Sequence, residues 1–301
     1  MQVQRRSFLK STIALSAFPF AGYPSTEIGS KNKSANNRFK ISLNTYSFNA
    51  PLRSGKINLG DVIDFCAAQG FEGVDLTGYY FPGYPAVPTD EYIYQLKRKA
   101  HRLGIAVSGT GIRTDFVEAD KTIRAKDVEL TRRWIEVAAK LGAPVIRIFS
   151  GKAVPANVSR ETATNWLLDD IKTCVDYGKQ HGVIVAVQNH NDFLKTADET
   201  IDLLKKIDSE WFGLVLDTGS FTTLEPYSEI TKAIPYAVNW QIKEKINYNG
   251  KNADVDLPKL FRIIKDSDYR GFLPIETLNP GDPFAIIPPF LKQVRESMER
   301  F

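Results

Sequence analysis

Residues 182–193 of the chain read GVIVAVQNHNDF. In this stretch the apolar run Val183–Val187 follows a glycine and is followed at once by four polar residues. An uninterrupted apolar run of this length is typical of a strand buried on both faces, as the strands of a parallel sheet are. We therefore expect a parallel strand here, with Gln188, Asn189 and His190 at its carboxyl end.

Three later apolar runs also end in polar side chains that can act as ligands. FGLVLD ends at Asp217, AVNWQIKE contains Gln241, Lys243 and Glu244, and GFLPIE ends at Glu276. Because parallel strands of one barrel present their carboxyl ends on the same side, these side chains are expected to form a ring around one point. The alternative is that each is a polar strand end that only bonds a neighbouring loop.

The chain from residue 39 onward alternates between short apolar runs and amphipathic stretches. The apolar runs begin near Phe39, Gly73, Ile105, Val145, Val183, Phe212, Val238 and Phe272. Helical periodicity is clear over residues 61–69, 90–103, 126–141, 162–180 and 196–207, and fainter over 227–234 and 257–265. The alternation predicts eight βα units, and hence a single α/β domain over residues 39–301 that folds as a (β/α)8 TIM barrel rather than an open sheet.

The first 38 residues differ in composition from the rest. RRSFLK at residues 5–10 precedes a modest apolar run at residues 13–21. This order of regions is the twin-arginine export pattern, so we interpret residues 1–26 as a signal segment and residues 27–38 as a polar linker. Export by this route leads to the periplasm. No A-x-A-like cleavage site follows, so the segment is either cut elsewhere or retained as an anchor.

The formal charge of +4 is concentrated in that first segment. Residues 1–38 contain six Lys and Arg residues and one acidic residue, which leaves a formal charge of −1 for the remainder. A near-neutral domain lacks the basic surface with which proteins bind nucleic acid or anionic lipid, and no apolar run is long enough to span a bilayer. Cys66 and Cys174 lie in apolar helical patterns and are expected to be buried thiols.

Four of the strand-end residues form a set of oxygen ligands: Gln188, Asp217, Gln241 and Glu276. Two carboxylates and two amide carbonyls suit a hard divalent cation and leave positions for substrate oxygens. A cation bound in this way polarises a carbonyl or hydroxyl group while a carboxylate moves the proton. The pattern therefore predicts a divalent metal as cofactor, with Mn, Mg, Co and Zn all compatible.

The order of these strand ends resembles that of the xylose isomerase-like TIM-barrel superfamily of sugar isomerases, epimerases and sugar-derived dehydratases. Members typically end strand 5 in Glu-Asn-His, strand 6 in Asp-x-Gly-His, strand 7 in His-x-Lys-Asp and strand 8 in Glu. This chain has QNH at 188–190, DTGS at 217–220, QIKE at 241–244 and PIE ending at Glu276. The resemblance covers residues 39–301 and implies a sugar phosphate isomerase/epimerase-like enzyme that acts on a small sugar or keto-sugar.

The resemblance also implies roles for individual residues. Asp217 and Glu276 correspond to metal ligands, and His190 lies beside the substrate. Gln241 stands where histidine is usual, although some dehydratases of the superfamily have glutamine there. Gln188 replaces the usual glutamate, and because an amide cannot exchange a proton near neutral pH, two-base epimerisation through a pair of glutamates is not expected.

One-base chemistry remains open to such a site. Glu276 would remove a proton next to a carbonyl, and His190, Lys243 or Glu244 would supply the acid. This arrangement suits an aldose–ketose isomerisation or a β-elimination. Lys243 and Glu244 have the alternative interpretation of a buried ion pair with each other.

The remaining strand ends supply the expected substrate contacts. Asn44 and Tyr46 follow the first strand, Arg113 follows the third, and Asn189 and Glu244 stand beside the ring residues. These five are predicted to bind substrate.

One arginine and five aromatic residues complete the set of candidate side chains. Arg147 lies inside the apolar run VIRIF, and because an unpaired buried charge is costly, we expect it to point inward toward a carboxylate of the ring. The aromatic residues Tyr79, Tyr80, Phe81, Tyr84 and Trp240 would either form a wall for a sugar ring or belong to the core.

We expect a metal-assisted sugar isomerase, epimerase or lyase that is exported from the cytoplasm. The alternative is an exported sugar-binding protein that keeps the barrel and has lost catalysis. An apurinic endonuclease of the same barrel is disfavoured, because its metal cluster needs many His ligands and the chain has three His. The substrate stays open, and a homo-oligomer is compatible with the sequence.

Overall fold

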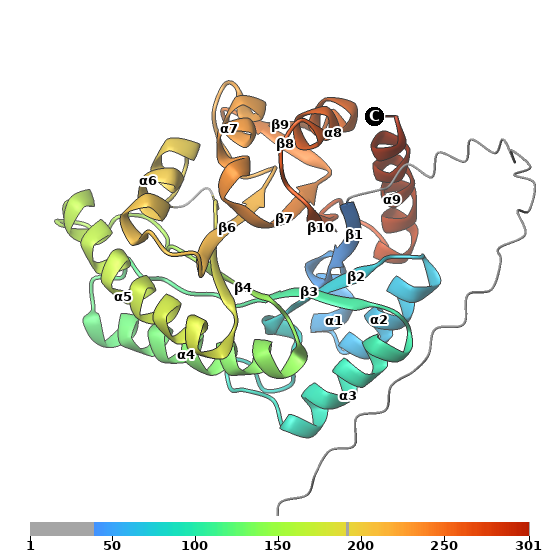
Figure 1. The fold of residues 1–301 in the computed structure, drawn as a ribbon, viewed down its shortest axis with the longest axis horizontal. Coiled ribbons are helices and arrows are strands. Elements are labelled where there is room, and N and C mark those ends of the chain that lie inside the picture. Colours follow the sequence, from blue (N-terminus) through green and yellow to red (C-terminus); the bar gives the residue numbers. More distant parts are fainter. Residues whose placement is uncertain (1–38, 191–192, 301) are drawn as a thin grey trace, which may run out of the picture. The chain divides into compact units, whose positions relative to one another are not determined.

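Eight parallel strands close into a barrel in the computed structural model, which describes residues 39–190 and 193–300 (Figure 1). Around the barrel the strands follow the order β1-β10-β7-β6-β5-β4-β3-β2. They are β1 (Phe39–Asn44), β2 (Gly73–Thr77), β3 (Ala106–Gly111), β4 (Val145–Phe149), β5 (Ile184–Gln188), β6 (Phe212–Asp217), β7 (Ala237–Lys243) and β10 (Gly271–Glu276). The predicted (β/α)8 barrel is confirmed, whereas the interpretation of residues 1–38 lies outside the described residues.

Helices separate the barrel strands along the chain. The longer ones are α2 (Leu59–Ala68), α3 (Asp90–Arg102), α4 (Lys121–Leu141), α5 (Arg160–His181), α6 (Ala197–Ile207), α7 (Pro226–Ala233), α8 (Leu257–Lys265) and α9 (Pro283–Glu299). Shorter turns are η1 (Thr45–Phe48), α1 (Asn49–Arg53), η2 (Gly78–Tyr80) and η3 (Ile234–Tyr236). Among the described helices, none combines the length and the apolarity that crossing a bilayer requires.

Helix α4 shows how local chemistry sets the boundaries of these elements. It begins at Lys121, earlier than the periodicity predicts, because the Asp120 side chain accepts a hydrogen bond from the backbone N–H of Thr122 and caps the helix. It ends at Leu141, and the next residue, Gly142, has a left-handed φ of 79° that favours glycine. The next strand, β4, can therefore start directly after a sharp turn.

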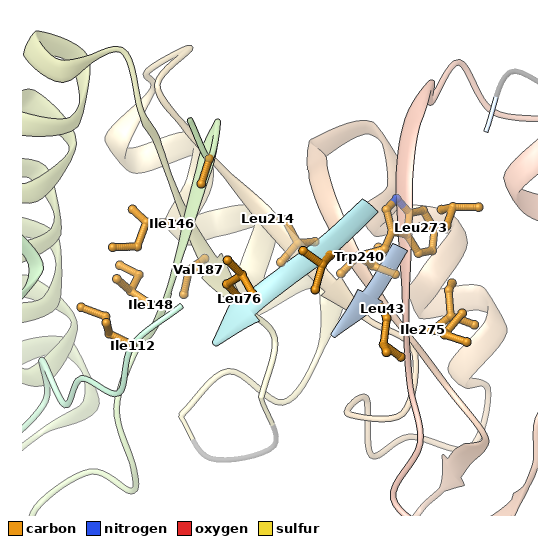
Figure 2. Close-up of a cluster of buried hydrophobic side chains, with 14 of the residues drawn as sticks. Leu43, Leu76, Ile112, Ile146, Ile148, Val187, Leu214, Trp240, Leu273 and Ile275 are labelled. Carbon is orange, nitrogen blue, oxygen red and sulfur yellow. The ribbon is translucent and has the colours of Figure 1, made fainter. Parts of the chain in front are cut away.

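Apolar side chains from neighbouring strands pack together in the core (Figure 2). Leu76, Leu214 and Ile275 are fully buried, and each such side chain contributes about 1.5–3 kcal/mol by leaving water. Trp240 is also fully buried, with its ring 5.6 Å from that of Tyr269. It therefore belongs to the core and not to an aromatic wall.

The two thiols are buried and free, as predicted. Burial raises the pKa of Cys174 to about 12 and raises the pKa of Cys66 further. Both side chains therefore remain protonated and act as small apolar groups.

A two-stranded hairpin that the sequence reading did not predict follows β7. It consists of β8 (Lys245–Tyr248) and β9 (Lys251–Asp254), which pair antiparallel. Asn249 and Gly250 connect them with φ values of 49° and 88°. Two positive φ values with an Asn-Gly sequence are the mark of a tight hairpin turn. The hairpin lengthens the wall of the barrel on the side where β7 ends.

A layer of polar side chains lies inside the barrel below the strand ends. Asn239 Nδ2 donates to Asp75 Oδ2 at 3.2 Å and to the Ser108 carbonyl at 3.5 Å. Gly109 makes room for this contact, since a Cβ there would lie 2.7 Å from both Asn239 Nδ2 and Asp75 Oδ2. Burial raises the pKa of Asp75 to about 6, although the nearby charge of Arg147 lowers it in part.

We predict that Asp75→Asn makes the protein more stable at neutral pH. The folded protein binds a proton at Asp75 more readily than the unfolded chain, whose carboxyl has its ordinary pKa of 3.8. Protonation of Asp75 therefore adds about 2–3 kcal/mol to the free energy of unfolding. This stabilisation is fully present below about pH 4 and is lost as pH rises through about 6. Asparagine keeps the neutral form at every pH.

Urea denaturation of wild type and Asp75→Asn at pH 4.5 and pH 7.5 measures this effect. The stability difference between the two should grow in favour of the variant at the higher pH. A difference that does not change with pH would show that the Asp75 carboxyl does not titrate in this range.

Candidate functional site

A cavity of about 530 Å³ opens at the carboxyl ends of the barrel strands. It is lined by residues of β4 to β7 and β10, by residues that follow β1, β2 and β3, and by the β8–β9 hairpin. This is the face at which TIM barrels hold their active sites. The ring predicted from the four strand ends lies at the bottom of this cavity.

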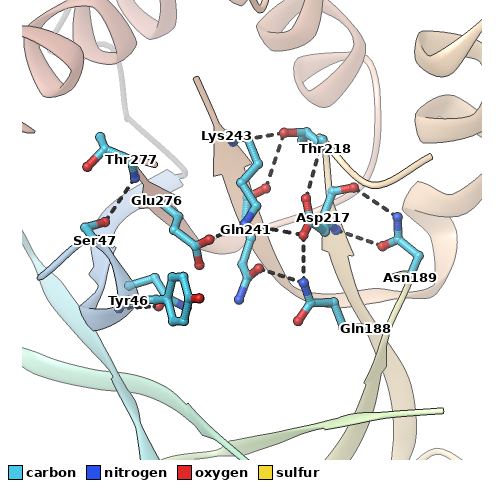
Figure 3. Close-up of polar contacts among 12 residues, drawn as sticks. Tyr46, Ser47, Gln188, Asn189, Asp217, Thr218, Gln241, Lys243, Glu276 and Thr277 are labelled. Carbon is cyan, nitrogen blue, oxygen red and sulfur yellow. Dashed lines mark hydrogen bonds and ion pairs between the residues drawn. The ribbon is translucent and has the colours of Figure 1, made fainter. Parts of the chain in front are cut away.

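A lysine ammonium lies between the two carboxylates of the ring (Figure 3). Lys243 Nζ makes a very short hydrogen bond to Glu276 Oε1 and lies 3.5 Å from Asp217 Oδ2. Asp217 and Glu276 are 1% and 4% exposed. Burial by itself would lower the pKa of the Lys243 ammonium, but the charges of Asp217 and Glu276 outweigh it and raise that pKa. The interpretation of Lys243 and Glu244 as an ion pair with each other is therefore wrong.

The two amides of the ring connect to the same carboxylate network. Gln188 Nε2 donates to Asp217 Oδ2 at 2.6 Å and to Gln241 Oε1 at 2.8 Å. Gln188 Oε1 is buried and has no hydrogen-bond partner. All four predicted ligands therefore converge, and one buried amide oxygen among them is left unsatisfied.

Backbone contacts hold the ring residues in position. Asn189 Oδ1 accepts from the Asp217 N–H at 2.8 Å, and Asn189 Nδ2 donates to the Asp217 carbonyl at 2.9 Å. The Thr277 N–H donates to Ser47 Oγ at 3.0 Å and ties the end of β10 to the turn after β1 (Figure 3). Gly219 leaves a path for Lys243, because a Cβ there would lie 2.9 Å from Lys243 Cγ.

The residues of the ring fit a divalent cation. Rotating the Gln188 amide by half a turn exchanges its N and O atoms, and its unsatisfied oxygen then points toward the oxygens of Asp217 and Gln241. Two carboxylates and two amide oxygens are the hard donors that such ions take. In the described part of the chain, no three His, Cys, Asp or Glu side chains gather closely enough to form a metal site without the amides.

Four further predicted residues line the cavity: Tyr46, Arg113, His190 and Glu244. The His190 ring lies edge-on to Phe149 with centroids 5.0 Å apart. Glu244 Oε2 accepts from the N–H groups of Leu278 and Asn279, so this carboxylate holds the loop after β10.

Two predicted substrate-binding residues lie outside the lining of the cavity. Asn44 Oδ1 accepts from the Tyr46 N–H and from Thr77 Oγ1, so its side chain joins β1 to β2. Asn189 uses its amide on the backbone of Asp217, as described above. Both side chains shape the cavity from behind.

Arg147 lines the cavity, but it does not pair with a carboxylate of the ring. Its Nη1 donates to the Ile112 carbonyl, and its guanidinium carbon lies 4.3 Å from the Phe149 ring centre. Among the described residues, no carboxylate oxygen lies within 4.0 Å of its nitrogens. The expectation of an ion pair is therefore wrong, because β4 places Arg147 on the β3 side of the cavity.

Several lining residues were missed by sequence reasoning. Phe149 ends β4, while Asn247 and Asn252 come from the hairpin and Leu278 from the loop after β10. The Asn-Gly pair at 249–250 was the available signal for the hairpin. No comparable pattern marks Leu278.

The comparisons with known proteins agree with this fold. The sequence model of the xylose isomerase-like TIM barrel family matches residues 63–301. The C-glycoside deglycosidase alpha subunit of Arthrobacter globiformis is 23% identical over 185 residues, which are 59% of this chain and 47% of that protein. The chain thus matches about half the length of this curated relative.

Two solved structures with the same fold align with this chain over almost their whole length. The 3-keto-D-glucoside 4-epimerase from E. coli has a TM-score of 0.68 at 13% identity, over 86% of this chain and 99% of that one. The probable 3-DHS dehydratase from Bacillus anthracis has a TM-score of 0.64 at 18% identity, over 85% and 98%. Since the family match extends over well more than half of the sequence, the chain belongs to the xylose isomerase-like TIM barrel family.

Proposed function

We propose that the protein is a divalent-metal-assisted enzyme that transfers a proton next to the carbonyl of a small keto-sugar or sugar derivative. The observation that carries this proposal is the contact of the Glu276 carboxylate with the Lys243 ammonium at the bottom of the cavity. A buried carboxylate beside a buried ammonium offers a proton acceptor and a proton donor within one substrate's reach.

Each residue of the ring has a part in this chemistry. Gln188, Asp217, Gln241 and Glu276 would hold a divalent ion, which would polarise the substrate carbonyl. Lys243 Nζ donates to Glu276 Oε1, and the Glu276 carboxylate is the group that takes the proton. Gln188 orients its neighbours and moves no proton, because an amide has no suitable pKa.

The acid must therefore come from another side chain. Lys243 Nζ already donates to Glu276, and His190 lines the cavity next to Phe149. Either group can return a proton to the neighbouring carbon, which gives an isomerase or epimerase outcome, or protonate a departing hydroxyl, which gives a lyase outcome. The related proteins include an epimerase of a keto-glucoside and a probable dehydratase, which supports this range of reactions.

A second candidate is a sugar-binding protein without catalysis. The hydrogen bonds from Gln188 Nε2 to Asp217 and Gln241 favour it, because they join the ring residues to one another instead of to a cation. In that case the cavity would bind a sugar as it stands, with Lys243 as the permanent partner of both carboxylates.

Glu276→Gln should abolish the proton transfer. Wild type with Mn²⁺ in D₂O should exchange the hydrogen next to the carbonyl of D-fructose, D-psicose or a 3-keto-D-glucoside, as followed by proton NMR. The variant should be slower by about 10²-fold or more, because the proton acceptor is lost. Glu296→Gln, on the surface of α9, is the matched control and should exchange at the wild-type rate. Equal rates for Glu276→Gln and wild type would contradict the proposed role.

Gln188→Glu should bind Mn²⁺ more tightly than wild type. A third carboxylate in the ring should strengthen the affinity by about 10- to 100-fold in a calorimetric titration. Gln95→Glu, which adds the same charge on the exposed face of α3, should leave the affinity unchanged, and Asp217→Ala with Glu276→Ala should remove binding. If Gln188→Glu gains a proton-exchange activity that wild type lacks, the second candidate is favoured. If Gln188→Glu loses an activity that wild type has, the proposed enzyme function is favoured.

We also propose that residues 1–26 direct export by the twin-arginine route to the periplasm. The support is the sequence RRSFLK followed by an apolar run. Changing Arg5 and Arg6 to Lys should move the full-length protein from the periplasmic to the cytoplasmic fraction of expressing cells. An unchanged distribution would contradict this proposal.

A further inference from the structure

The charged groups that line the cavity separate into two halves. The carboxylates Asp217 and Glu276 lie with Lys243 at the ends of β6, β7 and β10. On the opposite side, at β3 and β4, the charged lining residues are two arginines, Arg113 and Arg147. A substrate that fills the cavity therefore meets the proton-transfer groups at one end and guanidinium groups at the other.

Both guanidinium groups face one tyrosine ring. The guanidinium carbons of Arg113 and Arg147 lie 5.0 Å and 5.4 Å from the centre of the Tyr79 ring. Tyr79 and Arg113 lie at the cavity wall, and Arg113 is exposed there. The two positive charges are thus directed at one region of the cavity.

Arg147 is the unusual member of this pair. It is 5% exposed, and among the described residues its Nη1 donates a hydrogen bond to the Ile112 carbonyl. Its Nε is buried with no hydrogen-bond partner, and no carboxylate oxygen of the described residues lies within 4.0 Å. A buried guanidinium without an ion pair is costly, so its retention calls for a partner from outside the chain.

The neighbouring strand is shaped to accept this guanidinium. A Cβ added at Gly111 would lie 2.8 Å from Arg147 Nε and 2.9 Å from both Cζ and Nη2. Glycine at 111 therefore lets the flat guanidinium lie against β3. With Nη1 held by the Ile112 carbonyl and Nε buried, Nη2 is the nitrogen left to donate a charge-assisted hydrogen bond in the cavity that Arg147 lines.

We propose that the substrate carries a carboxylate, which Arg147 binds through Nη2 and Arg113 covers from the rim. This inference rests on the proposed function and names its substrate class, a keto-sugar acid. Asp75 is the nearby carboxyl that feels the Arg147 charge, and Asp217 and Glu276 add negative charge to the other half of the cavity. A singly charged carboxylate suits this balance better than a doubly charged phosphate.

Isothermal titration of the full chain with D-glucuronate, D-galacturonate, D-glucose, D-galactose and glucose 6-phosphate tests the proposal. Wild type should bind each uronate about 10-fold or more tightly than the matching neutral sugar, since one charged hydrogen-bonded contact is gained. Arg147→Gln should remove this preference, and Arg113→Gln should reduce it. Arg147→Lys keeps the charge but loses the planar guanidinium that Gly111 accommodates, so it should retain only part of the preference.

The matched control is Arg133→Gln, which changes an exposed arginine of α4 that pairs with Glu129. It should keep the full preference for the uronates. Circular dichroism checks that each variant is folded. If Arg147→Gln does not fold, Arg113→Gln tests whether the two arginines bind the carboxylate. Equal affinity for uronates and neutral sugars, an unchanged preference in folded Arg147→Gln, or tighter binding of glucose 6-phosphate than of the uronates would each overturn the proposal.

Binding and proton exchange separate this inference from the proposed function. A wild type that prefers uronates but exchanges no proton in any substrate would reject the proposed function and leave the carboxylate site standing. A wild type that exchanges protons in neutral keto-sugars and shows no preference for uronates would reject the carboxylate site alone.

Discussion

The burial of two carboxylates at the ends of β6 and β10 is the constraint on which the site depends. Asp217 and Glu276 are almost inaccessible to water, and charges in such a place are tolerated only when they are paired. Lys243 lies on β7, between the strands that carry them, and brings one ammonium to both. The surrounding residues hold these three charges together. The Gln188 amide donates to Asp217, Gly219 leaves room for Lys243, and Asn189 bonds the Asp217 backbone.

Strand register brings these residues to one level. Glu276 pairs with Lys243 across β10 and β7, and Asp217 pairs with Gln241 across β7 and β6. Because side chains alternate along a strand, Gln241 and Lys243 point to the same side, and both reach the ring. Glu244 falls on the other side of the alternation and bonds the loop after β10 instead.

The barrel and the residues of the ring could be predicted from sequence, because buried parallel strands leave a plain apolar signal and their polar ends mark one face. The partners of those residues could not. Nothing in the run VIRIF distinguishes an Arg147 that pairs with a carboxylate from one that bonds the Ile112 carbonyl. Likewise, Asn189 looks like a cavity residue in sequence, but its amide bonds the Asp217 backbone, which depends on the register of β5 and β6.

The glutamine at 188 and the lysine at 243 are complementary. A glutamate at 188 would place a third carboxylate within hydrogen-bond distance of Asp217, where the amide now donates at 2.6 Å, and one ammonium would not balance three negative charges. With Gln188 the ring has two carboxylates and one ammonium, so each buried carboxylate has the same lysine as its partner.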